Sequence, residues 1–550
     1  MKNSLLPLLA SILLQSFQMS AQANYFVATT GSNANPGTSV GLPWQTIQYA
    51  LDHVSAGAVI QVRGGIYHEK INWSASGTAA MPVVLTNYLD EEPIVSGNGI
   101  PGQTAIIHIE NKSHLRIENL VLEDNYMAEA KGIYVVGQGE DITIEGCTIR
   151  NIGFTTNPAT NPNPVNGQAH GILVNGRTTV GYKDIFIKKN ELHNLITGNS
   201  ESLTLVGNVF NFEIDNNSLH NNTNIGIDIA GHYSWAVDAG VPALLNQARN
   251  GTVTRNIVYE HRRFSNLDAP AGIYADGSKD VVIEHNFVFR NGNGLSVGCE
   301  NTGKTAENIV VKNNFVFDND NNGIFFGANT GDIVNCHLRN NTFLKNGMLE
   351  IYTMEIFLQK STGCLIANNI LYARTISHYG IGLFGYTAVN LDIDYNLVFR
   401  EGGDLSELIT GDPAPPANTN TVAANPLLVN AGLPSPDFHL QPTSPAINQG
   451  NNSYVSANEK ELDQGTRIVG PAVDKGADES GSQGCATSFV LNGIVPAGIF
   501  QATSSATSNG AIEAGSSVTI RAPEILLQPG FQVIAGGLFS AEVSGCAVLP

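Results

Sequence analysis

Between Leu120 and Asn396 a short polar phrase returns with nearly fixed spacing. It consists of an aliphatic residue, two variable residues and an asparagine, and the asparagines are Asn190, Asn217, Asn256, Asn286, Asn314, Asn341, Asn369 and Asn396. Successive asparagines are 27, 39, 30, 28, 27, 28 and 27 residues apart. The intervening segments alternate in polarity over short stretches, and no long helical pattern interrupts them. Such a period predicts a β-solenoid, in which each coil buries its apolar face only by stacking on its neighbours.

A second phrase, glycine followed by an aliphatic residue, a variable residue and another apolar residue, begins eight to nine residues after several of these asparagines. It begins at Gly226, Gly294 and Gly323. Because side chains alternate along a strand, its aliphatic residues point inward and the variable positions outward. The asparagine falls at a fixed corner, where its amide can hydrogen-bond the equivalent amide one coil away. We therefore predict a vertical ladder that contains Asn286, Asn314, Asn341 and Asn369.

The segment before the repeats has the pattern of a cap. Tyr25 begins a strand, residues 44–54 have helical periodicity, and residues 58–62 form a buried strand. The phrases GSNANPGT, PWQTIQYAL and VRGGIYHE in this segment, together with the repeats, resemble the right-handed parallel β-helix of the pectate-lyase-like superfamily. That resemblance implies an all-β fold, a β-solenoid with an N-terminal capping helix. The helix would cover the open end, whose bare strand edges otherwise promote aggregation.

Residues 1–23 have the features of a signal peptide. Lys2 precedes an apolar run from Leu5 to Leu14, and Ala21-Gln22-Ala23 is a cleavage pattern. The apolar run is too short to span a bilayer, and no other run approaches membrane length. We predict cleavage after Ala23 and a protein that is secreted to the outside, the periplasm or the cell surface, without membrane insertion.

The repeat is no longer recognisable in the sequence after Asn396. Residues 425–450 and 462–479 resemble the tail that closes many bacterial β-helix proteins, so the solenoid domain is assigned to residues 24–479. Its aspartates Asp463, Asp474 and Asp478 are interpreted as turn and cap residues. Residues 485–550 form a small separate β domain, and the phrase APEILLQPGFQVIAGGLFSAEV resembles the three-coathanger-stack domain of secreted bacterial proteins. This resemblance implies an accessory role.

The chain is acidic. Its 550 residues include 28 Lys and Arg against 48 Asp and Glu, which gives a formal net charge of −20. This excess argues against nucleic acid or an anionic membrane as a partner. It also opposes an anionic polysaccharide, unless local cations or a bound metal reverse the sign in the binding cleft. We expect a monomer that acts on an extended polysaccharide.

The six cysteines fall into two groups. Cys485 and Cys546 bracket the C-terminal domain and are predicted to form a disulfide in an oxidising compartment. Cys336 and Cys364 each lie five residues before a ladder asparagine, and Cys147 takes the asparagine position of its own coil. These three and Cys299 are predicted to be buried free thiols, because no cysteine or histidine spacing typical of metal sites occurs.

Three insertions interrupt the period within about four consecutive coils. They are residues 154–170, residues 232–250 and residues 260–271. Long loops in a compact fold are usually functional or disordered. The outward positions of the same coils are unusually polar and aromatic, and they include Asn175, Arg177, Asp228, His232, Tyr274, Asp276 and Glu300. No lysine falls in this outward column. The coincidence predicts a functional groove at these coils.

Roles follow from the residue types. Asp228 and Asp276, on coils about 4.8 Å apart, are predicted to share a cation, and Ca²⁺ is the expected ion. The expected catalytic acid and base come from His232, Tyr233, His261, Arg262, Arg263 and Tyr274. Substrate binding is assigned to Asn175, Arg177, Trp235 and Glu300. If no cation is shared, one aspartate has a raised pKa and acts as a general acid.

Two chemistries suit such a groove. In β-elimination on a uronic-acid polysaccharide of the alginate or pectate type, a cation neutralises the substrate carboxylate and a base removes the C5 proton. In glycoside hydrolysis two carboxylates carry the reaction. The family resemblance favours the lyase. A non-catalytic carbohydrate-binding or adhesin solenoid is the third possibility, because fold alone does not decide function.

Overall fold

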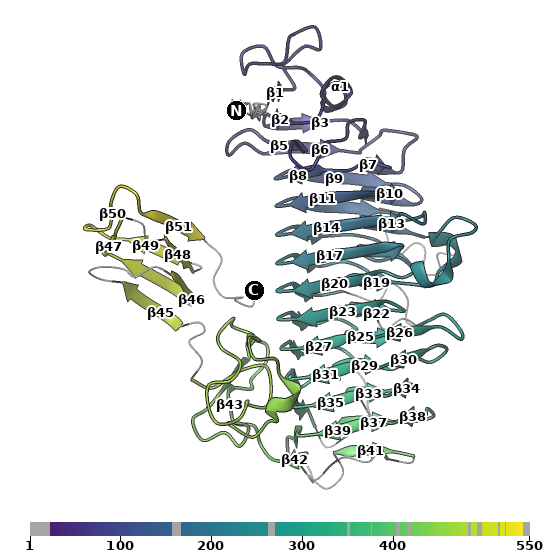
Figure 1. Cartoon of the computed structure of the whole chain (residues 1–550), viewed down its shortest axis with the longest axis vertical. Helices are drawn as coiled ribbons and strands as arrows, with labels where there is room; N and C mark the ends of the chain where they lie inside the picture. The colour runs from purple at the N-terminus through teal and green to yellow at the C-terminus, as the bar shows by residue number, and fades with distance from the viewer. Residues whose placement is uncertain are drawn as a thin grey trace, which may run out of the picture.

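A computed structural model describes residues 23–156, 167–261, 270–348, 353–375, 377–402, 408–412, 414–415, 418, 420–481, 486–491, 498–514, 517–522 and 524–542. From β1 (Ala23–Val27) to β42 (Val422–Ala423) the chain winds through three parallel sheets that stack coil upon coil (Figure 1). One continuous apolar cluster, from Val27 to Leu408, fills the interior between the sheets. The fold is the predicted right-handed parallel β-helix. Within the described residues, no helix is long and apolar enough to cross a membrane.

The first sheet has 17 strands and runs the length of the solenoid. Its strands are β1 (Ala23–Val27), β2 (Ala58–Val62), β5 (Val83–Asn87), β8 (Leu115–Glu118), β11 (Gly139–Glu145), β14 (Tyr182–Lys188), β17 (Val209–Asp215), β20 (Arg249–Thr254), β23 (Lys279–Glu284), β26 (Thr305–Glu307), β27 (Val310–Lys312), β30 (Asp332–Val334), β31 (His337–Arg339), β34 (Ser361–Thr362), β35 (Leu365–Ala367), β38 (Ala388–Val389) and β39 (Asp392–Asp394).

The second sheet has 12 strands. They are β4 (Ile71–Asn72), β7 (Ala105–Glu110), β10 (Ala130–Gly137), β13 (Ala169–Gly176), β16 (Leu203–Gly207), β19 (Ile227–Ala230), β22 (Ala271–Asp276), β25 (Asn293–Gly298), β29 (Ile324–Phe326), β33 (Met354–Leu358), β37 (Tyr379–Leu383) and β41 (Ile409–Gly411). This sheet carries the predicted outward column.

The third sheet has 13 strands. They are β3 (Gly65–Tyr67), β6 (Pro93–Ser96), β9 (Val121–Tyr126), β12 (Thr148–Gly153), β15 (Glu191–His193), β18 (Ser218–His220), β21 (Ile257–Tyr259), β24 (Phe287–Phe289), β28 (Phe315–Phe317), β32 (Thr342–Leu344), β36 (Ile370–Ala373), β40 (Leu397–Arg400) and β42 (Val422–Ala423).

A short helix covers the N-terminal end of the stack, as predicted. Helix α1 (Ile47–His53) begins after Thr46, whose hydroxyl accepts the Tyr49 amide hydrogen bond as an N-cap. Its buried face is Ile47, Ala50 and Leu51, and these residues join the solenoid core. In Figure 1 the helix lies at the end of the coils that carries β1 and β2.

The asparagine ladder is present. Each ladder asparagine from Asn190 to Asn369 donates an amide hydrogen bond to the Oδ1 atom of its counterpart on the next coil, over 2.9–3.0 Å. The residue before it adopts a left-handed conformation, with φ of 53° at Asn313 and Asn340. Asparagine tolerates that conformation, which explains the frequent Asn-Asn pairs. Cys147 takes the first position, where its N–H donates to Asn190.

A second ladder runs parallel to the first and was not predicted. It contains Asn222, His261, Asn291, Asn319 and Asn346, and it ends on the carboxylate of Glu355. Each member lies five residues after a member of the first ladder, except for Glu355 at the end. The regular offset means that the sequence held a signal for this ladder.

The tail after β42, which resembled the closing tail of other β-helix proteins, packs in the described residues against the outer side of the coils. It folds back along the third sheet, where the hairpin β43 (Leu428–Asn430) and β44 (Asp437–Leu440) places the Phe438 ring 5.2 Å from Phe315. Asp474 and Asp478 accept hydrogen bonds from the backbone N–H groups of Asn448 and Leu440, which lie 26 and 38 residues away, so they join separate segments of the tail.

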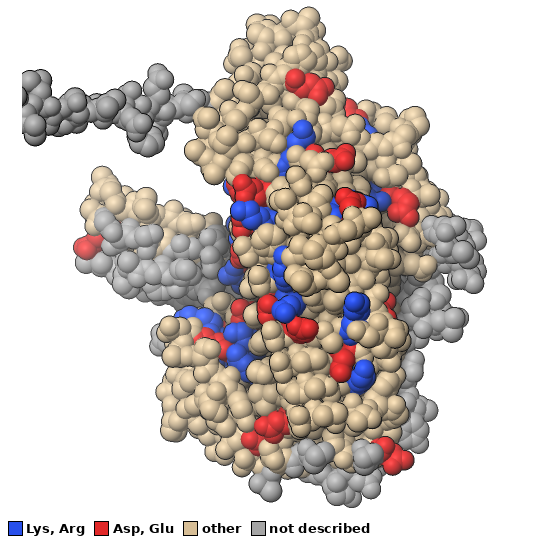
Figure 2. Space-filling model, turned by 45° about the vertical axis from the view of Figure 1, so that its right-hand side comes forward, with Lys and Arg blue, Asp and Glu red and all other residues tan. Residues whose placement is uncertain are grey.

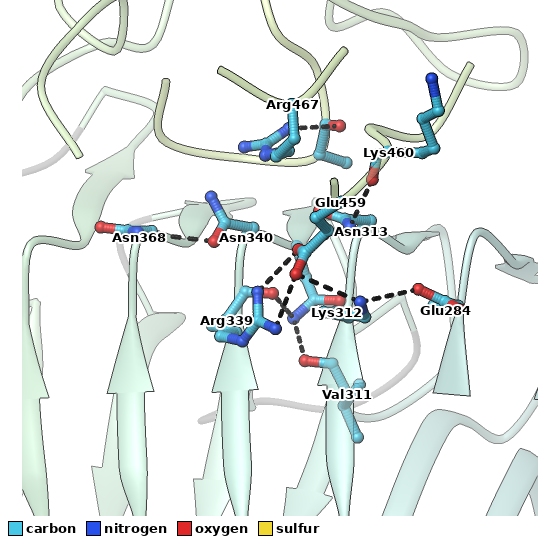
Figure 3. A network of polar contacts seen from close by, with 12 residues as sticks. Glu284, Val311, Lys312, Asn313, Arg339, Asn340, Asn368, Glu459, Lys460 and Arg467 are labelled. Carbon is cyan, nitrogen blue, oxygen red and sulfur yellow. Dashed lines mark hydrogen bonds and ion pairs between the residues drawn. The ribbon is translucent and has the colours of Figure 1, made fainter. Parts of the chain in front are cut away.

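An ion-pair network fastens this tail to the coils (Figure 3). Glu459 is 7 % exposed and receives two hydrogen bonds from the Arg339 guanidinium, at 2.7 and 2.8 Å. The Lys312 ammonium lies 3.2 Å from Glu459 and 3.0 Å from Glu284. These cations lower the pKa of Glu459 to about 2, against the opposing effect of burial. The tail is therefore held by charge as well as by aromatic packing.

The C-terminal residues form sheets of their own. Their strands are β45 (Ala486–Leu491), β46 (Gly498–Ser508), β47 (Ala511–Ile512), β48 (Ser517–Arg521), β49 (Glu524–Leu527), β50 (Gln532–Val533) and β51 (Leu538–Glu542). A separate small apolar cluster lies among them, formed by Ala506, Ile512, Val518, Ile520 and Ala522. Cys485 and Cys546, the predicted disulfide, lie outside the described residues. The other four cysteines are buried free thiols, as predicted.

Several basic side chains on the surface form ion pairs with carboxylates of neighbouring coils. Lys183 contacts Glu140 at 2.6 Å and Lys188 contacts Glu213 at 2.7 Å. On the face shown in Figure 2, basic side chains lie next to acidic ones, and most of the surface is uncharged. The acidic net charge therefore does not form a single field over this face.

Candidate active site

A groove of about 1070 Å³ runs across the outer face of the second sheet, at the predicted coils. Its floor comes from the outward positions of β10, β13, β16, β19, β22, β25 and β29. The residue 232–250 insertion forms one wall, with 3₁₀ turns at Ser234–Ala236 and Ala243–Leu245. The sequence predicted that the insertions lie beside the polar outward positions of the same coils, and this loop does so.

Strand register fixes the positions of the two aspartates. Asp228 on β19 pairs with Thr204 on one side and Tyr274 on the other, whereas Asp276 on β22 pairs with Ala230. The aspartates are thus diagonal neighbours on adjacent coils, with Cα atoms about 7–8 Å apart. They lie farther apart than two residues placed directly above one another.

Asp276 is the most heavily hydrogen-bonded carboxylate in the groove. It is 1 % exposed, and its Oδ2 atom accepts the Tyr233 hydroxyl over 2.5 Å. Its Oδ1 atom accepts the Glu300 N–H over 2.9 Å. The Tyr233 hydroxyl also lies 3.1 Å from the Glu300 carboxylate. Since a hydroxyl carries one proton, only one of the two carboxylates receives it at a time.

Burial raises the pKa of three carboxyl groups in the groove. Burial, followed by the charge of Glu300, raises the pKa of Asp276 to about 7. Burial also raises the pKa of Glu201 to about 7 and the pKa of Asp228 well above its usual range, and each is reinforced by the other carboxylates. At neutral pH these groups therefore retain protons that ordinary aspartates and glutamates lose.

The two tyrosines lie against this carboxyl cluster. Burial and the neighbouring carboxylates, Asp276 first among them, raise the pKa of Tyr233 and the pKa of Tyr274. Both side chains therefore remain protonated phenols, which donate hydrogen bonds and do not act readily as bases.

Two buried polar atoms that line the groove lack a partner within the described protein. They are the Oδ1 atoms of Asn175 and Asp228, whose residues are 1 % and 5 % exposed. Buried acceptors are normally hydrogen-bonded, and an exception calls for a ligand, a water or a functional reason. Both residues were predicted to belong to the site.

Arg177 and Trp235 lie at the groove wall, as expected. Arg177 forms an ion pair with Asp238 at 2.9 Å and donates to the Trp235 carbonyl oxygen. The Trp235 side chain is 55 % exposed, and its ring lies 5.9 Å from the Tyr233 ring. Arg177 thus positions the loop that presents Trp235 to the groove.

Two histidine predictions are wrong. His261 lies inside the second ladder, next to Asn222 and Asn291, and burial lowers its pKa to about 3. His232 has φ of 70°, and its ring contacts the Thr305 carbonyl oxygen at 3.0 Å instead of lining the groove. The left-handed turn at His232 ends the strand alternation on which the prediction depended. Arg262 and Arg263 lie outside the described residues.

The polar groups in the groove that sequence reasoning missed include Lys131, Glu201 and Thr204. Lys131 on β10 is 5 % exposed, and its ammonium donates to the Glu129 carbonyl oxygen over 2.7 Å. The expectation that no lysine reaches the outward face is therefore wrong. Lys131 precedes the glycine from which the inward and outward alternation was counted, so it was left out of the outward column. His170 pairs with Lys131 on the next coil and is likewise followed by a glycine. Thr204 belongs to a coil that begins with Ser202 instead of the repeated glycine.

The residues expected to bind Ca²⁺ do not fit a shared ion. Calcium takes six to eight oxygen ligands in proteins. Among the described residues, no group of three or more His, Cys, Asp or Glu is arranged to hold a metal ion. Both oxygens of Asp276 are already hydrogen-bonded, and Asp228 is displaced along the strand. The geometry favours the alternative in which one aspartate keeps a proton.

The chain matches two models of β-helix families. Residues 25–177 match the Pel9A-like right-handed β-helix region, and residues 131–343 match a general right-handed β-helix region. The uncharacterized protein YwoF of Bacillus subtilis is 30% identical over 364 residues, which cover 63% of this chain and 74% of YwoF. The chain belongs to the pectate-lyase-like superfamily of right-handed β-helix proteins.

Other relatives differ in named activity. Pectate lyase PEL9 of Emericella nidulans is 34% identical over 114 residues, which cover 18% of this chain and 28% of PEL9. The crystal structure of pectate lyase Pel9A has a TM-score of 0.46 at 16% identity, covering 84% of this chain and 97% of that one. A GH136 lacto-N-biosidase from Eubacterium ramulus has a TM-score of 0.43 at 14% identity and covers 73% and 67%. The solved neighbours thus include both lyases and glycoside hydrolases.

Proposed function

We propose that this protein cleaves glycosidic bonds of an extended polysaccharide in the groove of the second sheet, by acid–base hydrolysis. The proposal depends above all on Asp276, a buried carboxyl at the groove floor with a pKa of about 7. A carboxyl that keeps its proton near neutral pH is suited to protonate a leaving oxygen. The predicted signal peptide accords with an extracellular substrate.

Glu300 is the proposed partner carboxylate. Its side chain is exposed in the groove, in contrast to the buried Asp276, and the two are bridged by the Tyr233 hydroxyl. Glycosidases use one protonated carboxyl and one ionised carboxylate, and different environments keep the two roles apart. In this assignment Asp276 donates a proton to the leaving oxygen. Glu300 activates a water or attacks the sugar carbon, and Tyr233 positions both groups.

Variants of these two residues test the proposal. Asp276→Asn and Glu300→Gln are each expected to lower the release of reducing ends from a polysaccharide panel by about 100-fold or more, the usual contribution of general acid–base catalysis. Asp90→Asn, an exposed aspartate in the N-terminal part of the chain, is the matched control. Full activity of both groove variants would contradict the proposal, and binding without turnover by the wild type would favour a carbohydrate-binding module.

A lyase that acts on a uronic-acid polysaccharide is the second candidate. Lys131 supports it, because burial lowers the pKa of its ammonium and makes it a better base. The similarity of part of the chain to a named pectate lyase also favours it. β-Elimination produces an unsaturated uronate that absorbs at about 235 nm, whereas hydrolysis produces no such product. Absorbance that rises with the release of reducing ends would select the lyase, and loss of that signal in Lys131→Met would identify its base.

A further inference from the structure

We infer that the groove binds a neutral, hydroxyl-rich glycan, and that an anionic uronate chain is not its ligand. This inference deepens the proposed function and rests on it, because it concerns the substrate of the same site. It comes from the balance of unpaired and paired polar groups along the floor.

One unpaired group is an amide oxygen, which only accepts, and the other belongs to a carboxyl that keeps a proton and can donate as well as accept. Asn175 on β13 and Asp228 on β19 line the groove, are nearly withdrawn from bulk solvent, and each has an Oδ1 atom without a partner in the described protein. A ligand that satisfies the Asn175 oxygen must bring a donor, and a group that both donates and accepts suits Asp228. Sugar hydroxyls and amides carry such donors, whereas a carboxylate brings only more acceptors.

The cations that line the groove are already paired. The Lys131 ammonium lies 3.4 Å from the Glu129 carboxylate, and the Arg177 guanidinium lies 2.9 Å from that of Asp238. Among the described lining residues these are the only Lys and Arg side chains, against five carboxyl groups. A uronate carboxylate that entered would displace an existing ion pair or lie beside another carboxylate, and both outcomes are unfavourable.

An exposed aromatic side chain supplies a surface for the sugar ring. Trp235 is 55 % exposed at the wall, with Tyr233 beside it. The loop that carries it is anchored by Ala236, which is fully buried against Leu173, Val206 and Ala230. A large aromatic ring held in this way packs against the apolar face of a neutral sugar. The floor therefore offers acceptors for hydroxyl groups, and the wall offers a stacking surface.

Binding to a catalytically impaired full-length protein tests this inference. Asp276→Asn would be titrated calorimetrically with neutral gluco-, manno-, galacto- and xylo-oligosaccharides, and with oligogalacturonates and alginate oligosaccharides. Each titration would be made at low and at high salt. We expect at least one neutral oligosaccharide to bind at least tenfold more tightly than every uronate. Its affinity should change little with salt, because no ion pair forms.

Paired variants locate the contact. Trp235→Ala and Asn175→Leu, each in the Asp276→Asn background, should weaken the neutral ligand at least tenfold. Leu244→Ala should not, because Leu244 is 72 % exposed on the same insertion but does not line the groove. The inference would be overturned if a uronate bound more tightly than every neutral oligosaccharide, or if binding of the neutral ligand weakened strongly with salt. It would also be overturned if no oligosaccharide of either class bound, or if Trp235→Ala kept full affinity.

The two proposals fail in different ways. Hydrolysis of a uronate polymer by the wild type, without formation of an unsaturated product, would refute the neutral ligand and leave the assignment as a hydrolase intact. Binding of a neutral oligosaccharide without cleavage of any polymer made of that sugar would support the ligand class and refute hydrolysis.

Discussion

Replacing Asp276 by asparagine is expected to stabilise the protein at neutral and alkaline pH while it impairs activity. The amide keeps an oxygen that accepts the Glu300 N–H, and its nitrogen can donate to the Tyr233 hydroxyl. The substitution therefore removes a buried ionisable group and leaves the local geometry intact. Stability gained at the cost of function is the usual sign of a strained active site.

The magnitude follows from the pKa of Asp276, which is raised from 3.8 to about 7. Between these two values the unfolded chain loses the proton while the folded protein keeps it, so stability falls as pH rises. At 1.36 kcal/mol per pKa unit the difference is about 4 kcal/mol above pH 7. This value is an upper limit, because Glu201 and Asp228 compete for the same protons.

Thermal unfolding followed by circular dichroism from pH 4 to pH 8 measures this effect. The midpoint of Asp276→Asn should exceed that of the wild type by an amount that grows between pH 4 and pH 7 and is constant above it. Asp90→Asn should run parallel to the wild type. Parallel curves for Asp276→Asn as well would mean that Asp276 ionises freely in the folded protein, and the assigned general acid would be wrong.

Three further outcomes are expected. Asn314→Ala should lower the free energy of unfolding by about 1–3 kcal/mol, because it leaves neighbouring buried amides unpaired, whereas the exposed Asn98→Ala should have no effect in the same denaturation assay. Glu459→Gln should cost about 3–5 kcal/mol by leaving Arg339 uncompensated, detected as faster proteolysis of residues 425–480; unchanged digestion would contradict the ion-pair anchor. In the wild type the stabilisation by this anchor is fully present above pH 4.5 and is lost as pH falls towards 2, because the pKa of Glu459 is lowered from 4.5 to about 2 in the folded state. Activity should be unchanged in EDTA, because the assigned acid and base are carboxyl groups. A loss of activity in EDTA that added Ca²⁺ reverses would instead support a catalytic calcium ion.

The repeats by themselves determined the architecture. A period of 27 to 30 residues with a corner asparagine leaves few alternatives to stacked coils, because one coil cannot bury its own apolar face. The strand at residues 58–62, the capping helix and the first ladder were all predicted on local grounds. The second ladder was also present in the sequence, five residues after the first. It was overlooked because His261 lies beside two arginines and was interpreted as part of a basic patch.

The site was only partly accessible from sequence. Asp228, Tyr274 and Asp276 were found because alternation along a strand assigns each side chain to a face. Lys131 was missed because a glycine follows it and disturbs that alternation, and His232 was misplaced because a left-handed residue ends it. Such departures depend on how neighbouring coils pack, and no local pattern reports them.

The sequence therefore determined the coils, their stacking and the coils that carry the groove, because these follow from periodicity and from the need to bury apolar faces. Tertiary structure alone decided which carboxyl groups keep their protons. The raised pKa of Asp276 requires burial by residues far away in the chain, with Tyr233 and Glu300 on either side of it in sequence. The position of the tail was likewise decided by contacts such as Phe438 with Phe315. Electrostatics and long-range packing depend on what surrounds a residue in space, and neighbours in sequence do not reveal that.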